Sequence, residues 1–113
     1  MATLLYKGVP SNPENGLRVR LGYSVLSLSG DHTVTNQDAQ FLSIDPGADH
    51  RDVIMPNEAA SQGSFFFISN ASTTKKLNIK DSSGGALSPA GEIAAEKQYF
   101  VVCDGTAWQV IAP

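Results

Sequence analysis

The sequence predicts one small all-β domain, and three observations lead to this prediction. The chain has 113 residues, which is the usual size of a single domain. Charged residues make up 17%, against a usual share of about 25%, and Ser, Thr, Asn and Gly fill the difference. Glycines and prolines separate short apolar runs at intervals of about ten residues. These features exclude a coiled coil, a helical bundle and a disordered charged tail, and they favour a small antiparallel β-sandwich or barrel.

The start of the chain predicts an extended N-terminal arm over residues 1–16, followed by a single β domain over residues 17–113. Leu4, Leu5 and Tyr6 form a short apolar patch, and the prolines and glycines that follow favour an irregular path. Charge divides in the same way, because residues 1–29 carry +2 and the remainder carries −5. This division suggests an arm that docks elsewhere and a domain that faces solvent.

The strands of the domain are expected at regular intervals. The first begins at residue 17, where apolar side chains alternate with Arg18 and Arg20, and it continues toward residue 28. Further strands are expected over residues 32–35, 41–45, 53–55, 64–69, 77–79, 86–87, 99–103 and 107–111. Asp104-Gly105 predicts a hairpin between the last two. Residues 57–62 have the composition of one helical turn, and residues 92–98 are read as the lead-in to a strand.

Two of these strands are apolar on both faces. Phe65-Phe66-Phe67-Ile68 shows no alternation, and neither does the run from Tyr99 to Cys103. Such strands are expected in parallel sheets covered by helices, but this sequence offers no helices for that purpose. A neighbouring subunit is therefore the predicted cover, and the arm of the same chain is the alternative. The residues predicted at the subunit interface are Phe65, Phe66, Phe67, Tyr99 and Val101.

The overall charge of −3 argues against a nucleic-acid partner, which would require a basic surface. Lys75, Lys76 and Lys80 are instead read as parts of a solvated turn. The single cysteine, Cys103, excludes an intrachain disulfide and is expected to be a buried, inert thiol. No signal peptide or membrane-spanning apolar run is recognised, which predicts synthesis in the cytoplasm and no membrane partner.

No constellation in the sequence supports catalysis. His32 follows Asp31, and His50 lies between Asp49 and Asp52, but turn-like surroundings favour exposed histidines over metal ligands. There is no Gly-x-Ser-x-Gly elbow and no Gly-Lys-Ser/Thr phosphate loop. We therefore expect no catalytic residues, no metal site and no cofactor. Asn70-Ala71-Ser72 matches the N-glycosylation sequon, which has meaning only on a secretory route.

From residue 32 onward the order of features resembles a domain that recurs in the virions of tailed bacteriophages. Thr33-Val34-Thr35 precedes Asp38, an apolar segment closes at Pro56, and an aromatic strand ends at Asn70. The domain ends with a β-strand that runs into Asp104-Gly105-Thr106-Ala107-Trp108. Domains of this kind occur in capsid decoration (cement) proteins and in trimeric head and tail fibres.

The resemblance implies a β-tulip-like or sandwich-like domain that assembles as a homotrimer and has no enzymatic activity. A decoration protein of this kind would bind the major capsid protein on the outer surface of the mature virion head. Residues 1–30 do not match the domain pattern and would make the capsid contact, unless they add an edge strand to their own domain. The residues expected to bind the capsid are Leu4, Leu5, Tyr6, Arg18 and Arg20.

Two other functions remain open at this point. A fibre tip or host-surface module could recognise a glycan through Tyr23 or Trp108, although Trp108 is better explained as a packing anchor of the final hairpin. A small hydrolase would need His32 or His50. Copy number on the virion would separate decoration from fibre, and turnover that depends on a histidine would indicate the enzyme.

Overall fold

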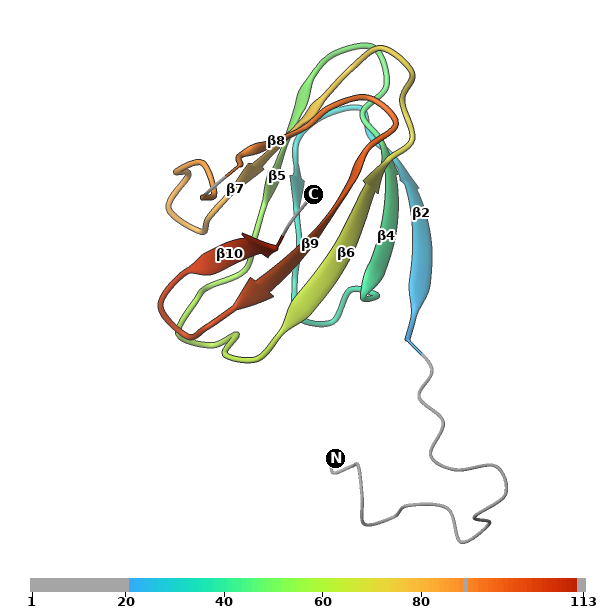
Figure 1. Cartoon of the computed structure of the whole chain (residues 1–113). Coiled ribbons are helices and arrows are strands. Elements are labelled where there is room, and N and C mark those ends of the chain that lie inside the picture. The colour runs from blue at the N-terminus through green and yellow to red at the C-terminus, as the bar shows by residue number, and fades with distance from the viewer. Residues whose placement is uncertain (1–20, 89, 112–113) are drawn as a thin grey trace, which may run out of the picture.

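The computed structural model describes residues 21–88 and 90–111, and every regular element in these ranges is a β-strand. Two sheets pack face to face (Figure 1). The five-stranded sheet has the order β10-β9-β6-β4-β2, formed by Trp108–Ile111, Gln98–Cys103, Phe65–Asn70, Phe41–Asp45 and Tyr23–Ser27. The four-stranded sheet has the order β3-β5-β7-β8, formed by His32–Thr33, Arg51–Ile54, Leu77–Lys80 and Glu92–Ile93. The prediction of an all-β, sandwich-like domain is confirmed.

Parallel pairing distinguishes this sandwich from the predicted antiparallel one. From β2 to β7 the chain crosses to the other sheet after every strand, so each sheet receives every second strand, and these run in the same direction. The pairs β2–β4, β4–β6, β3–β5 and β5–β7 are all parallel. The antiparallel prediction was wrong for these strands because apolar alternation records which face is buried, while it carries no information on which strand lies alongside.

Antiparallel pairing is confined to the strands that complete each sheet. β9 pairs antiparallel with both β6 and β10, and β8 pairs antiparallel with β7. The predicted Asp104-Gly105 hairpin joins β9 to β10. Gly105 has a positive φ of 95°, and the carboxylate of Asp104 accepts hydrogen bonds of 2.8 Å from the backbone N–H groups of Thr106 and Ala107.

Residues 57–62, which have the composition of one helical turn, and residues 92–98 do not form helices. Residues 57–62 form turns, in which the Asn57 side chain accepts a hydrogen bond from the Ala60 N–H. Within residues 92–98, Glu92 and Ile93 form β8 and Gln98 begins β9. The segment therefore leads into a strand, as expected, after contributing a short strand to the opposite sheet.

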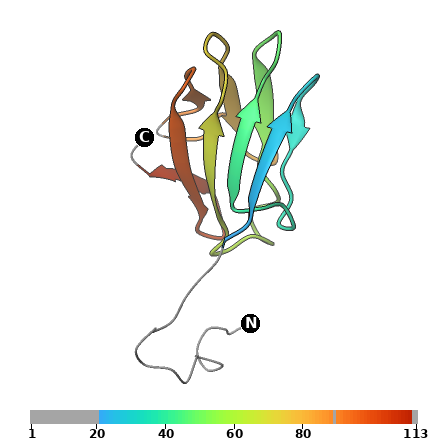
Figure 2. The same cartoon turned by 90° about the vertical axis from the view of Figure 1, so that its right-hand side faces the viewer.

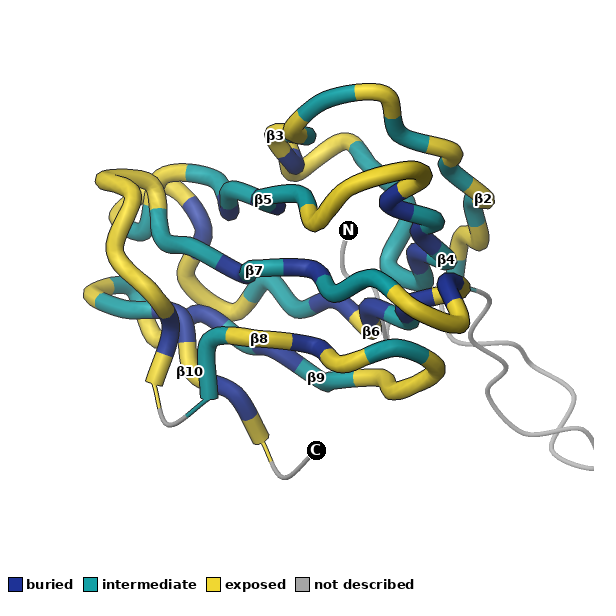
Figure 3. The backbone as a smooth tube through the Cα atoms, turned by 90° about the horizontal axis from the view of Figure 1, so that it is seen from above, coloured by how far each residue is buried: buried dark blue, intermediate teal, exposed yellow. Residues whose placement is uncertain are grey.

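The core lies between the two sheets, where buried residues of both line the interior (Figure 3). Trp108 and Phe66 are its largest fully buried side chains, and their ring centroids lie 5.8 Å apart. The Trp108 indole N–H donates a 2.9 Å hydrogen bond to the carbonyl of Pro56, which satisfies its polar group inside the core. Trp108 is thus the packing anchor that the sequence predicted, and it is not available to a ligand.

The predicted arm, residues 1–16, lies outside the described residues. The same holds for the expected capsid-binding residues Leu4, Leu5, Tyr6, Arg18 and Arg20. The described part of the domain begins at Leu21, two residues before β2, which is the outermost described strand on its side of the five-stranded sheet.

Candidate functional site

The outward faces of the two sheets differ in chemistry. The four-stranded sheet presents a polar surface on which Lys80 and Asp52 form an ion pair of 3.0 Å and Lys76 and Glu92 form one of 3.1 Å. The side-chain amide of Asn78 donates a hydrogen bond to Asp52, and this contact and the one from Lys80 lower the pKa of Asp52, with Lys80 making the larger contribution. This is the composition expected of a sheet face in contact with water.

The five-stranded sheet, whose strands face the viewer in Figure 2, presents an apolar surface instead. Four of the five phenylalanines of the chain point outward from it, while the fifth points into the core. Among the outward side chains of its strands, Asp45 is the only charged one that the structure describes. The outward residues are Tyr23, Val25, Ser27, Phe41, Ser43, Asp45, Phe65, Phe67, Ser69, Gln98, Phe100, Val102, Gln109 and Ile111.

A continuous row of large apolar side chains crosses all five strands of this face. Strand register pairs Tyr23 with Phe41, Phe41 with Phe67, Phe67 with Phe100, and Phe100 with Ile111. We call these five residues the aromatic row. Because registered neighbours on adjacent strands point to the same side of a sheet, the row forms one band on the outer surface.

The phenyl rings of the row pack against one another. The rings of Phe41 and Phe67 are stacked, with centroids 4.7 Å apart and planes inclined by 10°. Phe100 continues the row at 4.6 Å from Phe67, and Phe65 joins the cluster with centroids 5.8 Å from Phe100. Since the stacked faces are turned toward each other, the rings direct their edges to the outside. The rings therefore form one contiguous apolar surface across neighbouring strands.

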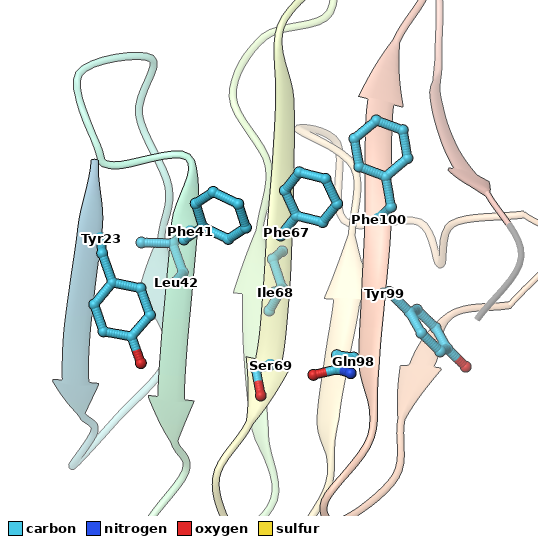
Figure 4. Close-up of a pocket in the computed structure, with 9 residues that line it drawn as sticks. All are labelled: Tyr23, Phe41, Leu42, Phe67, Ile68, Ser69, Gln98, Tyr99 and Phe100. Carbon is cyan, nitrogen blue, oxygen red and sulfur yellow. The ribbon is translucent and has the colours of Figure 1, made fainter. Parts of the chain in front are cut away.

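A shallow hollow of about 580 Å³ lies beside the aromatic row (Figure 4). Phe41, Phe67 and Phe100 stand side by side on adjacent strands along it. Ser69 and Gln98, paired in the neighbouring register position, add small and polar groups. Tyr23 lies at the β2 end and is 67% exposed. The hollow is thus an apolar surface with a polar margin.

The five predicted interface residues divide between the two sides of the sheet. Phe65 and Phe67 lie on the outer face, as an interface requires. Phe66 and Val101 lie in the core of the same chain, with 2% and 0% of their surface exposed, so no neighbouring subunit can contact them. Tyr99 is half-buried and packs against that core. The prediction is corrected for Phe66 and Val101 because the opposite sheet of the same chain covers their side of β6 and β9.

Sequence reasoning did not identify Phe41, Phe100 and Ile111 as parts of this surface. Phe41 begins a strand that alternates cleanly, so nothing marked its outward side chain as functional. The useful signal was strand geometry, because successive side chains of a strand point to opposite faces, which places Phe100 on the side opposite Val101. Only the strand register assembles these residues into one row.

The two histidines occupy structural positions. His32 Nε2 lies 3.6 Å from the carboxylate of Asp38, and His50 Nδ1 accepts a hydrogen bond from the Lys76 N–H. Within residues 21–88 and 90–111 no three His, Cys, Asp or Glu side chains gather as they would around a metal ion. Cys103 is buried, as predicted, with its sulfur 3.4 Å from the carbonyl oxygen of Glu58.

No family model, curated protein or solved structure matches this chain. In the part of the chain that the structure describes, no helix is long and apolar enough to cross a membrane. The outer face of the five-stranded sheet is therefore the feature on which a function can be argued.

Proposed function

We propose that this protein is a non-enzymatic structural component of a tailed-phage virion, a capsid decoration (cement) protein. It binds the outer surface of the mature head as a homotrimer and stabilises the head by bridging capsomers. The observation that carries the proposal is the aromatic outer face of the five-stranded sheet, on whose described strands Asp45 is the single charged outward side chain. An exposed apolar face of this kind marks a site of contact with another protein, which is expected of a protein that functions in an assembly.

The contrast between the two outer faces supports this function. Contiguous apolar patches of several hundred Å² mark interaction sites on soluble proteins, whereas single exposed apolar residues need no explanation. The face around the aromatic row is contiguous, because the phenyl rings touch across neighbouring strands. The ion pairs of the other sheet show that the same chain places charges on a face that water contacts.

The proposed partner on the head is the major capsid protein. The sequence before residue 21 carries Lys7, Arg18 and Arg20 against Glu14, while the rest of the chain has a net charge of −5. We call residues 1–20 the leader; they include the predicted arm. Their basic side chains and the apolar residues Leu4, Leu5 and Tyr6 suit a contact with acidic and apolar groups on a capsid. Laid across a joint between capsomers, the leader makes contacts that only the assembled lattice offers, and these contacts resist the outward pressure of packaged DNA.

Binding of the purified protein to heads of the phage that encodes it tests this proposal. Expanded heads without the protein should take it up to saturation, at hundreds of copies per particle, and should then lose their DNA at a higher temperature. Unexpanded proheads are the matched control, because their lattice lacks the mature joints. Failure to cosediment with expanded heads at micromolar concentration would rule out the decoration function.

A glycan-binding fibre module is the second candidate, and the exposure of Tyr23 beside the hollow favours it. Sugars stack on the open faces of aromatic rings, and Tyr23 offers one at the edge of the sheet. The stacked phenyl rings argue the other way, because their faces are already occupied. Binding to host glycans that Tyr23→Ala abolishes, together with a few dozen copies per virion, would establish this alternative instead.

A further inference from the structure

We propose that the aromatic row is the interface between copies of this chain, so that the outer face of each five-stranded sheet is covered by a neighbouring copy. The inference takes the trimeric state from the proposed function, on which it rests. It adds the surface through which the three copies contact one another. The residues proposed to form the interface are Tyr23, Phe41, Phe67, Phe100 and Ile111, with Phe65 beside them.

The orientation of the rings indicates a protein partner. Phe41, Phe67 and Phe100 use their faces against one another, with centroid distances of 4.7 and 4.6 Å. What remains outside is a band of ring edges together with the side chains of Tyr23, Val25 and Ile111, which are 67%, 68% and 46% exposed. Ring edges and aliphatic groups interdigitate with other apolar side chains, as in the interior of a protein.

Charge indicates that this partner is another copy. Residues 21–111 carry five Lys and Arg residues against ten Asp and Glu residues, so two such domains repel each other at most orientations. The outer face of the five-stranded sheet is the exception, since Asp45 is the single charged side chain pointing out from its strands, and it lies at the end of β4. Through this face, two domains of equal charge can approach without bringing carboxylates together.

The size of the face matches that of an interface. Five strands about 4.8 Å apart, each of up to about six residues at about 3.3 Å, make a surface of roughly 480 Å². In a closed trimer each face is shared between two neighbours, so covering the three faces buries roughly 1,400 Å² in the whole assembly, which is about the size of one standard protein interface. A partner much smaller than the domain would leave part of the row in water.

The two ends of the row are chemically different, which fits a closed ring of three copies. Among the described strands, the row ends in Tyr23 on β2, with Val25 beside it, and in Ile111 on β10. In a cyclic trimer each copy meets its neighbours through two different patches. The β2 end of one copy can therefore meet the β10 end of the next, and the phenyl rings between them face the three-fold axis.

Charge substitution in the middle of the row tests this inference. Phe67→Glu and Phe100→Glu should convert a trimer of three 12.0 kDa chains to monomers and weaken its association at least about a hundredfold. Thr33→Glu, on an exposed position of β3 in the other sheet, is the matched control and should remain trimeric. Light scattering on a sizing column gives the mass, and circular dichroism reports folding. Should Phe67→Glu fail to fold, Phe67→Ser is measured in its place.

The outcomes separate this inference from the function on which it rests. Folded variants that remain trimers overturn the interface, and head binding by the wild type still supports decoration. If the variants dissociate and the wild-type trimer does not bind expanded heads, the proposed interface is supported and the decoration function is overturned. A monomeric wild type overturns the interface. In that case, loss of head binding by Phe67→Glu would show that the aromatic face binds the capsid. Alternatively, a hydrophobic dye that binds the monomer only after residues 1–15 are deleted would show that the N-terminal arm covers the face.

Discussion

The side-chain amide of Asn70 donates a 3.0 Å hydrogen bond to the backbone carbonyl of Ile93, and so links β6 of one sheet to β8 of the other. The same amide donates to the carbonyl of Lys75 at 2.8 Å, and its oxygen accepts from the Ser72 N–H at 2.9 Å. With 2% of its surface exposed, Asn70 has every polar group paired. The sequon at Asn70 therefore marks a structural asparagine, whose nitrogen no glycosyltransferase could reach in the folded domain.

Replacing Asn70 should destabilise the domain. Asn70→Ala leaves the carbonyls of Lys75 and Ile93 without the donors they have now, which should lower the free energy of unfolding by about 1–3 kcal/mol. Urea denaturation followed by Trp108 fluorescence measures the change. Asn78→Ala is the control, because its amide bonds to Asp52 on a half-exposed surface, and its effect should be clearly smaller. Equal losses for the two variants would contradict a bridging role for Asn70.

Adjacent phenylalanines of β6 should respond differently to truncation. Phe66→Ala removes a side chain packed 5.8 Å from Trp108 in the core and should cost about 3–5 kcal/mol of subunit stability. Phe67→Ala acts on the outer face and should change the stability of an isolated subunit much less. Denaturation at low protein concentration separates the two effects. By the same reasoning Phe66→Asp should abolish folding rather than dissociate a folded trimer.

Acid should weaken the four-stranded sheet through Asp52. Its pKa is held below the usual value by the hydrogen bond from Lys80, then by the one from Asn78, so the stabilising contribution is complete above the unfolded-state pKa of about 3.8. This contribution is lost as the pH falls through the lower pKa of the folded state. Between pH 5 and pH 3, Asp52→Asn should therefore lose less stability than the wild type. Identical pH profiles in urea denaturation would show that Asp52 contributes nothing.

Glu58, Asp81 and Asp104 should keep some acid sensitivity in the Asp52→Asn variant. Their pKa values are lowered as well, mainly by hydrogen bonds from the Ser82 side chain, the Ser83 side chain and the Ala107 backbone, respectively. The profile of Asp52→Asn should therefore be shallower than that of the wild type without becoming flat.

Removal of the leader should separate assembly from capsid binding. Deleting residues 1–15 leaves the aromatic row intact, so the trimer mass should be unchanged, while the affinity for expanded heads should fall at least about tenfold, which is a loss of about 1.4 kcal/mol. Cosedimentation with heads at several protein concentrations gives the affinity. A chain of the same length in which Leu4, Leu5 and Tyr6 are replaced by serine is the matched control and should behave like the deletion. Full affinity without these residues would show that the leader plays no part in binding.

Strand positions were largely predictable because local patterns determine them. The predicted segment 41–45 coincides with β4, the predicted segment 99–103 differs from β9 by one residue, and the turn at Asp104-Gly105 joins β9 to β10. In each case an apolar run or turn chemistry supplied a signal within the segment itself. The order of strands within the sheets had no such signal, since it depends on a chain path that crosses between sheets.

The residues of the candidate surface could be predicted only in part, because their arrangement also depends on the order of strands within the sheets. The sequence separates Phe65 and Phe67 from Phe66, but it does not say which side faces the core. That choice depends on the opposite sheet, whose buried residues Ile79 and Ile93 come from later in the chain. The pairing of Tyr23 with Phe41 and of Phe67 with Phe100 likewise joins residues distant in sequence, so it is a property of the folded chain alone.

The crossing path of the chain also has a consequence for biosynthesis. Strand β6 lies between β4 and β9, so Phe67 has one neighbour from early in the chain and one from late in the chain. On the ribosome, Phe41 and Phe67 are made before Phe100 exists, and the aromatic row is complete only when β9 and β10 have been synthesised and have joined the sheet. Nascent chains on one polysome would thus present an incomplete row to each other, so the proposed association through the row would follow synthesis of the last strands.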